Sequence, residues 1–163
     1  MSGIALTLRA LHDGERALEK DLLATAERHR GDHEVHHVAG DLARWSREHS
    51  TRLAELGRHH DVDLDGPADD PSPGALAGLR EKAAEALGRR PEAGLLLLYD
   101  LRDLHLAAAR NSLYWEMLAQ TAQATHDERL LALVTDCHPQ TLRQMRWTNT
   151  LIKELSPQLL TSA

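Results

Sequence analysis

Glu15 and His49 are the residues whose types and positions point most directly to chemistry. Each interrupts an apolar stripe of helical spacing, and they lie 16 residues before and 18 residues after Gly31, where the two stripes are separated. If the two segments fold back on each other, a rise of about 1.5 Å per residue places both side chains at nearly the same depth in a helical bundle. A buried carboxylate and imidazole are costly without a partner, so the pair predicts an interior polar or metal-binding site.

Further polar residues share these inner faces. His12 and Glu19 lie three residues before and four residues after Glu15, so the three are on one helix face. His105 follows Leu101 by one turn near the middle of a third stripe, and a fourth stripe carries Thr141, Gln144 and Thr148 at the equivalent level. The candidate metal ligands are therefore Glu15, His49, His12, Glu19 and His105.

Four long segments of helical periodicity must position these residues. Helices are predicted at residues 4–30, 32–60, 91–124 and 127–156, with a short helix at residues 73–88 in the linker between the second and third. Gly31 ends the first helix and Asp32 caps the second, and so short a corner predicts an antiparallel hairpin. Thr125 to Glu128 has the pattern of a capping box, while Pro139 should kink the last helix and Pro157 should end it.

The matched helix lengths predict an all-α antiparallel four-helix bundle that forms a single domain over residues 1–163. The linker is long enough to travel the length of the bundle as a crossover, and an up-down-up-down arrangement remains an alternative.

Composition limits the function further. The aromatic fraction is only 3% with no Phe, so Leu and Ala must build the core, which favours helices. A net charge of −6 argues against nucleic-acid binding, and Arg143 and Arg146 are interpreted as a solvated helix face, with a local basic patch as the alternative. A single cysteine, Cys137, excludes a disulfide framework. No signal peptide or membrane-spanning run is evident, so the expected location is cytoplasmic without membrane association. The sequence contains no Gly-rich phosphate-binding loop and no nucleophile elbow, so it does not support hydrolase or kinase activity.

The chain resembles the ferritin-like superfamily, over nearly its whole length as architecture and at a few positions as motif. Members supply a glutamate from each of two helices and a Glu-x-x-His pair from each of the other two. Glu15 matches the first-helix glutamate, and His49 matches the second-helix histidine, with Ser46 three residues before it in place of glutamate. The remaining positions hold Leu104 or His105 on the third helix, and Thr141-x-x-Gln144 on the fourth.

The resemblance implies a bacterial-type bundle protein with a divergent metal centre for iron, manganese or zinc, acting through metal binding or as an interaction module. Because at most two of about six ligands match, ferroxidase activity is not expected. Such bundles often associate through outer helix faces, which implies a homo-oligomer or a protein partner. The alternative is a metal-free scaffold whose interior polar residues hydrogen-bond one another and fix helix register.

A second alternative starts from the eleven histidines. His33 and His37 are four residues apart on one helix face, a spacing that suits a surface zinc or nickel ion as well as an ordinary solvated face. Leu11-His12-Asp13 also resembles the start of a hemerythrin-like domain, which implies a non-haem metal protein. Leu53 stands where a carboxylate four residues after His49 would be needed for that match.

Overall fold

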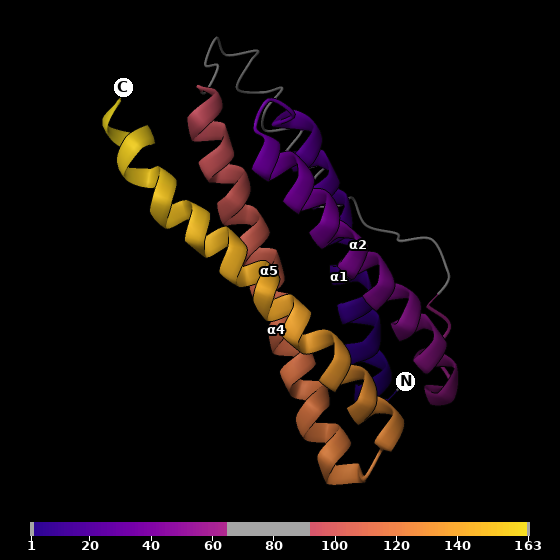
Figure 1. Ribbon diagram of the computed structural model, residues 1–163. Helices are drawn as coiled ribbons and strands as arrows, with labels where there is room; N and C mark the ends of the chain where they lie inside the picture. Colours follow the sequence, from indigo (N-terminus) through magenta and orange to yellow (C-terminus); the bar gives the residue numbers. More distant parts are fainter. Residues whose placement is uncertain (1, 65–91, 163) are drawn as a thin grey trace.

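The computed structural model describes residues 2–64 and 92–162 of the 163-residue chain, and within these two stretches every regular element is a helix. The predicted all-α class is therefore confirmed. The predicted short helix at residues 73–88 lies outside the described residues. The elements are α1 (Gly3–Arg28), α2 (His33–Gly57), the 3₁₀ helix η1 (Arg58–His60), α4 (Ala93–Thr125) and α5 (Glu128–Thr161), drawn in Figure 1.

α1 and α2 are joined by a short corner. α1 ends at Arg28, two residues before the predicted end, and α2 begins at His33. Asp32 caps α2 as predicted, since its carboxylate accepts a hydrogen bond from the Val35 N–H at 3.1 Å. The corner reverses the direction of the chain, so the two helices pack side by side.

The turn between α4 and α5 corrects the predicted capping box. Thr125 is the last residue of α4, and its hydroxyl donates to the Thr121 carbonyl at 2.8 Å instead of capping α5. Asp127 caps α5 by accepting from the Leu130 N–H at 3.1 Å. The predicted cap was two residues early, because His126 takes the left-handed conformation, with φ 54°, that ends α4.

α5 continues past both of its prolines. The predicted end at residue 156 is wrong, because the helix runs to Thr161 with Pro157 inside it. A helical proline frees the carbonyl four residues earlier, here those of Thr135 for Pro139 and Lys153 for Pro157. All four of these residues are exposed, so water can satisfy the freed carbonyls and the helix persists.

Neighbouring helices run in opposite directions. In Figure 1, α1 and α5 run one way and α2 and α4 the other, and the closest packing joins α4 to α5 and α1 to α2. α1 also packs on α4, and α2 packs on α5 less closely than α1 does on α4. Arg28 at the end of α1 bonds to Asp100 near the start of α4, so α4 begins beside the α1–α2 corner. The end of α2 and the start of α4 therefore lie at opposite ends of the bundle.

The interior has apolar ends and a polar middle. One apolar cluster, which includes Leu11, Leu53 and Trp115, fills the end near the N-terminus, and another, around Leu22 and Leu104, lies towards the α1–α2 corner. On every helix, buried polar residues fall between these clusters. We refer to six of them as the central polar layer: Glu15 of α1, Ser46 and His49 of α2, Asn111 of α4, and Thr141 and Gln144 of α5.

Candidate functional site

Glu15 and His49 face each other at the centre of the bundle, as predicted. Glu15 Oε1 lies 3.3 Å from His49 Nδ1, and neither side chain is more than 1% exposed. Trp115 on α4 closes another side of the pair, because its indole N–H donates to the same Glu15 oxygen at 3.2 Å. The Trp115 ring also meets the His49 ring edge-on, with 5.8 Å between centroids. Three helices thus converge on one carboxylate.

Gln140 on α5 holds the other side of the imidazole. Its Oε1 lies 2.7 Å from His49 Nε2, so in this orientation the ring donates its Nε2–H to the amide oxygen. The Nδ1 lone pair of a neutral ring then points at a carboxylate, which also offers only lone pairs. These two acceptors repel at 3.3 Å, and either a proton on Nδ1 or a bound cation relieves the repulsion.

The pKa of His49 follows from this arrangement. Burial by itself lowers it, because the imidazolium loses its hydration. The contact with Glu15 and the negative charge of that carboxylate raise it, with help from Gln140 and Glu48. These effects outweigh burial, so the pKa of His49 lies above its ordinary value of 6.5. The pair therefore holds a positive charge more tightly than a free imidazole does.

Other buried polar atoms of the central polar layer have no hydrogen-bond partner. They include Glu15 Oε2, Thr141 Oγ1, Gln144 Oε1 and both amide atoms of Asn111. Gln144 is anchored through its other amide atom, which donates to the Ser46 hydroxyl at 2.9 Å. An unpaired buried polar atom costs about 1–3 kcal/mol. The layer therefore contains buried oxygens on α1, α4 and α5 that accept no hydrogen bond, one of them in the Glu15 carboxylate.

The separation of Glu15 and His49 is longer than a direct charge-assisted hydrogen bond and is compatible with a single small cation between the two atoms. A charge-assisted N–H···O bond measures about 2.7–2.9 Å, whereas the two atoms are 3.3 Å apart and Nδ1 forms no aligned hydrogen bond. A tetrahedral cation about 2.0–2.2 Å from each atom would separate them by about 3.3–3.5 Å. A metal-bound histidine also commonly donates its other ring N–H to an oxygen, as His49 does to Gln140.

The layer lacks the ligands of a two-metal centre. Among residues 2–64 and 92–162, no three His, Cys, Asp or Glu side chains form a group that could hold a metal ion. α4 and α5 place the neutral residues Asn111, Thr141 and Gln144 in the layer. Any cation here would be held by one carboxylate, one imidazole and neutral oxygens, without the bridging carboxylates that a second divalent ion requires.

The other predicted metal ligands, His12, Glu19 and His105, do not form a metal-binding group with Glu15 and His49. His12 is buried one turn before Glu15, and Glu19 is half-buried one turn after it. His105 is occupied elsewhere, with Nδ1 2.8 Å from the Thr148 hydroxyl. A metal-binding role for these three residues stays a prediction.

Asn111, Trp115 and Gln140 belong to the site although the sequence reasoning did not assign them to it. Asn111 interrupts the inner stripe of α4 between Ala108 and Trp115, a signal that could have identified it. Trp115 lies in an apolar cluster of the core, and its indole N–H also donates a hydrogen bond to Glu15. Gln140 is half-buried beside the inward-facing Thr141, and no sequence pattern marks it.

A second buried charge cluster lies where α4 begins. Asp100 is 6% exposed and accepts two hydrogen bonds from Arg28, at 3.0 and 3.1 Å. His29 Nε2 lies 2.8 Å from the same carboxylate. Because both carboxylate oxygens are satisfied by opposite charge or a ring nitrogen, we interpret this cluster as a clamp between α1 and α4.

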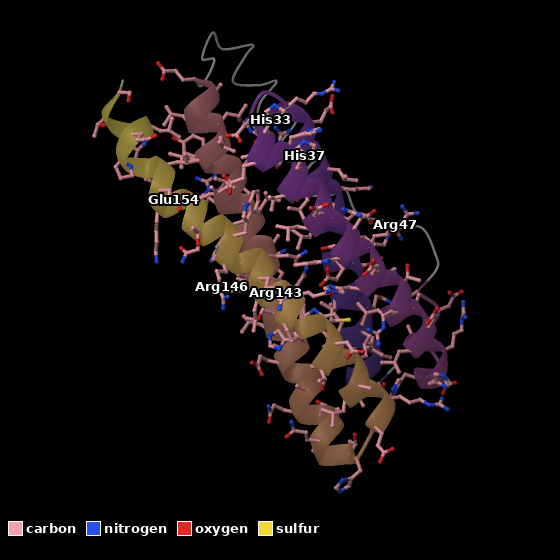
Figure 2. All side chains as sticks on the ribbon, viewed as in Figure 1. His33, His37, Arg47, Arg143, Arg146 and Glu154 are labelled. Atoms are coloured by element: carbon pink, nitrogen blue, oxygen red, sulfur yellow. The ribbon has the colours of Figure 1, made fainter. Side chains whose placement is uncertain are left out.

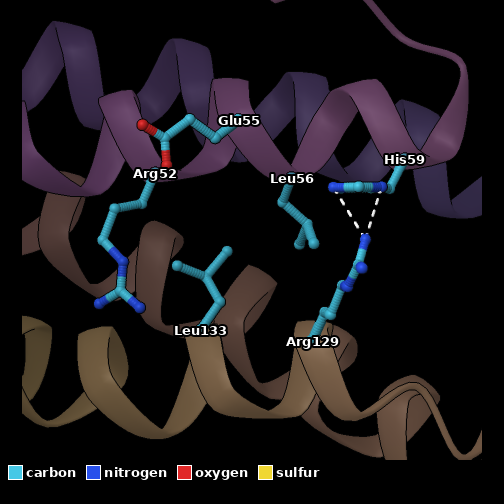
Figure 3. A pocket seen from close by; sticks show the side chains of 6 residues that line it. All are labelled: Arg52, Glu55, Leu56, His59, Arg129 and Leu133. Carbon is cyan, nitrogen blue, oxygen red and sulfur yellow. Dashed lines mark hydrogen bonds between the residues drawn. The ribbon is translucent and has the colours of Figure 1, made fainter.

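A shallow pocket between α2 and α5 carries two arginines (Figure 3). Arg129 reaches from α5 to the His59 ring, with Nη1 at 2.8 and 3.0 Å from its two nitrogens. Arg52 is paired with Asp136 at 2.9 Å. Glu55, Leu56 and Leu133 complete the lining. Since each arginine already has a partner and Glu55 adds negative charge, the pocket is a weaker candidate than the central pair.

The surface groups noted in the sequence lie on outer helix faces (Figure 2). His33 and His37 occupy the start of α2, with nearly parallel rings 5.9 Å apart. Arg143 and Arg146 are exposed on α5, with Glu154 further along the same helix. These residues lie on solvated faces, outside the central polar layer.

Comparisons with known proteins identified no relative of this chain. The chain matches no protein-family model, and searches of curated proteins and of solved structures found no similar protein. Within the described part of the chain, none of the helices is long and apolar enough to cross a membrane.

Proposed function

We propose that the chain is a ferritin-like bundle with a divergent metal centre, in which Glu15 and His49 hold one divalent cation. The observation that carries the proposal is the buried, poorly aligned 3.3 Å contact between Glu15 Oε1 and His49 Nδ1. The helix order and directions, with α2 and α4 parallel to each other, also agree with the crossover topology of ferritin-like bundles.

Asn111, Thr141 and Gln144 would supply neutral oxygens around the cation. One carboxylate and neutral oxygens give the ion less compensating negative charge than a di-iron site does, so the centre suits zinc, manganese or ferrous iron held singly. The cation would act as a fixed positive charge that binds a small ligand or stabilises the bundle. Ferroxidase activity is not part of the proposal, because it needs a second iron and bridging acids.

Metal content tests the proposal. The protein, purified without a histidine tag and stripped with a chelator, is dialysed against zinc, manganese or anaerobic ferrous iron, in a His33→Gln/His37→Gln background that removes the surface pair. We expect about one equivalent of one of these metals in this parent, and a loss of at least about tenfold in affinity in Glu15→Gln or His49→Gln.

Glu27→Gln is the matched control, because it changes an exposed acid on the same helix that is not among the candidate ligands. It should keep the parent's metal. A parent without metal, or Glu15→Gln and His49→Gln variants that bind as much as the parent, contradicts the metal centre. Mixing the ferrous protein with oxygen should give no rapid oxidation, and a transient peroxo-type absorption would contradict the single-ion interpretation.

A metal-free scaffold is the second candidate, because one reversed amide would remove the need for a cation and because Gln144 already binds α2 through hydrogen bonds. If the Gln140 amide is reversed, its N–H donates to His49 Nε2, and the ring then donates its Nδ1–H to Glu15 without any cation. The Gln144 bonds to α2 fit the same role, because they tie α5 to α2 through polar contacts. A hemerythrin-like centre has less support, since Leu53 is buried in the apolar cluster.

A further inference from the structure

α4 carries an apolar stripe on the face that points away from the bundle. Tyr99, Leu106, Leu113 and Met117 are 48%, 58%, 61% and 53% exposed. At about 100° per residue, the four side chains fall within an arc of about 40° on the helical wheel. The opposite face of α4 supplies core residues such as Leu104. A helix that is apolar on both faces is typical of one that is buried on both sides.

We propose that this α4 stripe is the surface through which two copies of the chain associate, α4 against α4 in antiparallel orientation. With Leu106 on the two-fold axis, Tyr99 lies opposite Leu113 of the partner subunit. In the same register Met117 lies opposite Leu95 of the partner subunit, a half-buried residue on the same line of the helix. The apolar residues of the stripe therefore match one another pairwise, as a self-complementary two-fold interface requires.

Charges beside the stripe favour a second copy as the occupant. Asp103 and Arg110 lie on the same flank, three residues before and four residues after Leu106, and both are accessible to solvent. In the antiparallel register, Asp103 lies beside Arg110 of the partner subunit, and the two-fold axis repeats this pair. Within one chain Asp103 contacts Arg102 at 3.1 Å, an exposed pair of small energy that leaves the carboxylate free to accept from a second donor.

Sedimentation of the full chain tests the surface. We expect wild type to sediment as a dimer and Leu106→Glu, which places two carboxylates on the axis, to have a dimer dissociation constant raised by at least about tenfold. Leu23→Glu is the matched control: Leu23 is 50% exposed on α1 and should leave the dimer unchanged. Helical content by circular dichroism checks that both variants fold. A monomeric wild type, including one whose stripe binds another protein or lipid instead, overturns the proposal, as does a Leu106→Glu variant that dimerises like wild type.

Charge reversal tests the orientation. Asp103→Arg and Arg110→Asp should each weaken the dimer, because each places like charges beside one another at both ends of the axis. Combining the two restores opposite charges in the antiparallel register, so the double variant should regain most of the lost affinity. A double variant weaker than both single variants overturns the antiparallel pairing. None of these substitutions is in the central polar layer. The results can therefore contradict the proposed dimer surface without contradicting the proposed metal centre.

Discussion

At the scale of single residues, one nitrogen decides how the central site behaves. His49 Nδ1 faces Glu15, while Nε2 is held by Gln140. A proton and a metal ion would compete for this nitrogen, because both bind its lone pair. Glu15 is fully buried, so bulk solvent does not hydrate its carboxylate. With the Gln140 oxygen towards Nε2, the carboxylate therefore favours a positive charge beside it, which either a proton on His49 or a metal ion can supply.

This competition predicts a pH dependence in chelator-treated protein. The pKa of His49 is raised when folded, so the ion pair stabilises the protein fully below the ordinary pKa of 6.5 and is lost as pH rises through the folded value. The advantage of wild type over Glu15→Gln in free energy of unfolding should therefore shrink with rising pH, by up to about 1.4 kcal/mol per pH unit. Urea titrations between about pH 5 and pH 9 measure it.

The same titrations on Glu27→Gln provide the control, because Glu27 is exposed on α1, and its difference from wild type should not follow the His49 titration. A pH-independent difference between wild type and Glu15→Gln would show that His49 is neutral in the folded protein, as in the reversed-amide arrangement.

At the scale of elements, the start of a helix depends on which side chain accepts hydrogen bonds from its first free backbone N–H groups. The sequence offers Thr125 and Asp127 as caps for α5, two residues apart, and both patterns are chemically reasonable. His126 adopts a left-handed conformation that ends α4 at Thr125. Asp127 then has the extended conformation that an N-cap needs. The boundary is thus set by one backbone conformation in the turn.

Substitutions at the two candidate caps should differ clearly. Asp127→Ala should lower the free energy of unfolding by about 1 kcal/mol, because Leu130 N–H loses its acceptor. Thr125→Ala removes an exposed hydroxyl from the end of α4 and should cost less than about 0.5 kcal/mol. Asp127→Asn retains a capping oxygen and should resemble wild type. Equal losses for Thr125→Ala and Asp127→Ala in denaturant unfolding would contradict this assignment.

At the scale of the whole molecule, two hairpins are held together by contacts between α1 and α4. Trp115 reaches Glu15 at the centre, and Asp100 binds Arg28 and His29 at one end. α2 and α5 pack less closely, and their contacts include the polar one between His49 and Gln140. The α1–α4 side therefore joins the hairpins more firmly than the α2–α5 side does.

Removing the end clamp should destabilise the whole bundle. Asp100→Ala removes a buried carboxylate that binds both Arg28 and His29, and we expect a loss of about 3 kcal/mol. Asp136→Ala is the control, because the Arg52–Asp136 pair has a similar length of 2.9 Å but exposed side chains, and its loss should cost less than about 1 kcal/mol. Thermal and urea unfolding measure both, and similar losses for the two variants would contradict a structural clamp.

Sequence periodicity alone was sufficient for the helical class, the four long helices to within a few residues, and the approach of Glu15 to His49. These properties depend on local spacing: a stripe every three or four residues defines a buried face, and similar distances from a corner place two residues at nearly the same depth. Asp32 could be assigned as a cap because capping is a contact within four residues.

Only the tertiary structure decided the partners of that pair. Trp115 and Gln140 reach it from 100 and 91 residues away along the chain, and Asp100 meets Arg28 across 72 residues. Such contacts depend on the rotation and offset of whole helices against one another, which a one-dimensional pattern does not specify. The extension of α5 beyond Pro157 likewise depended on whether the freed carbonyl faced water, a property of the packed bundle.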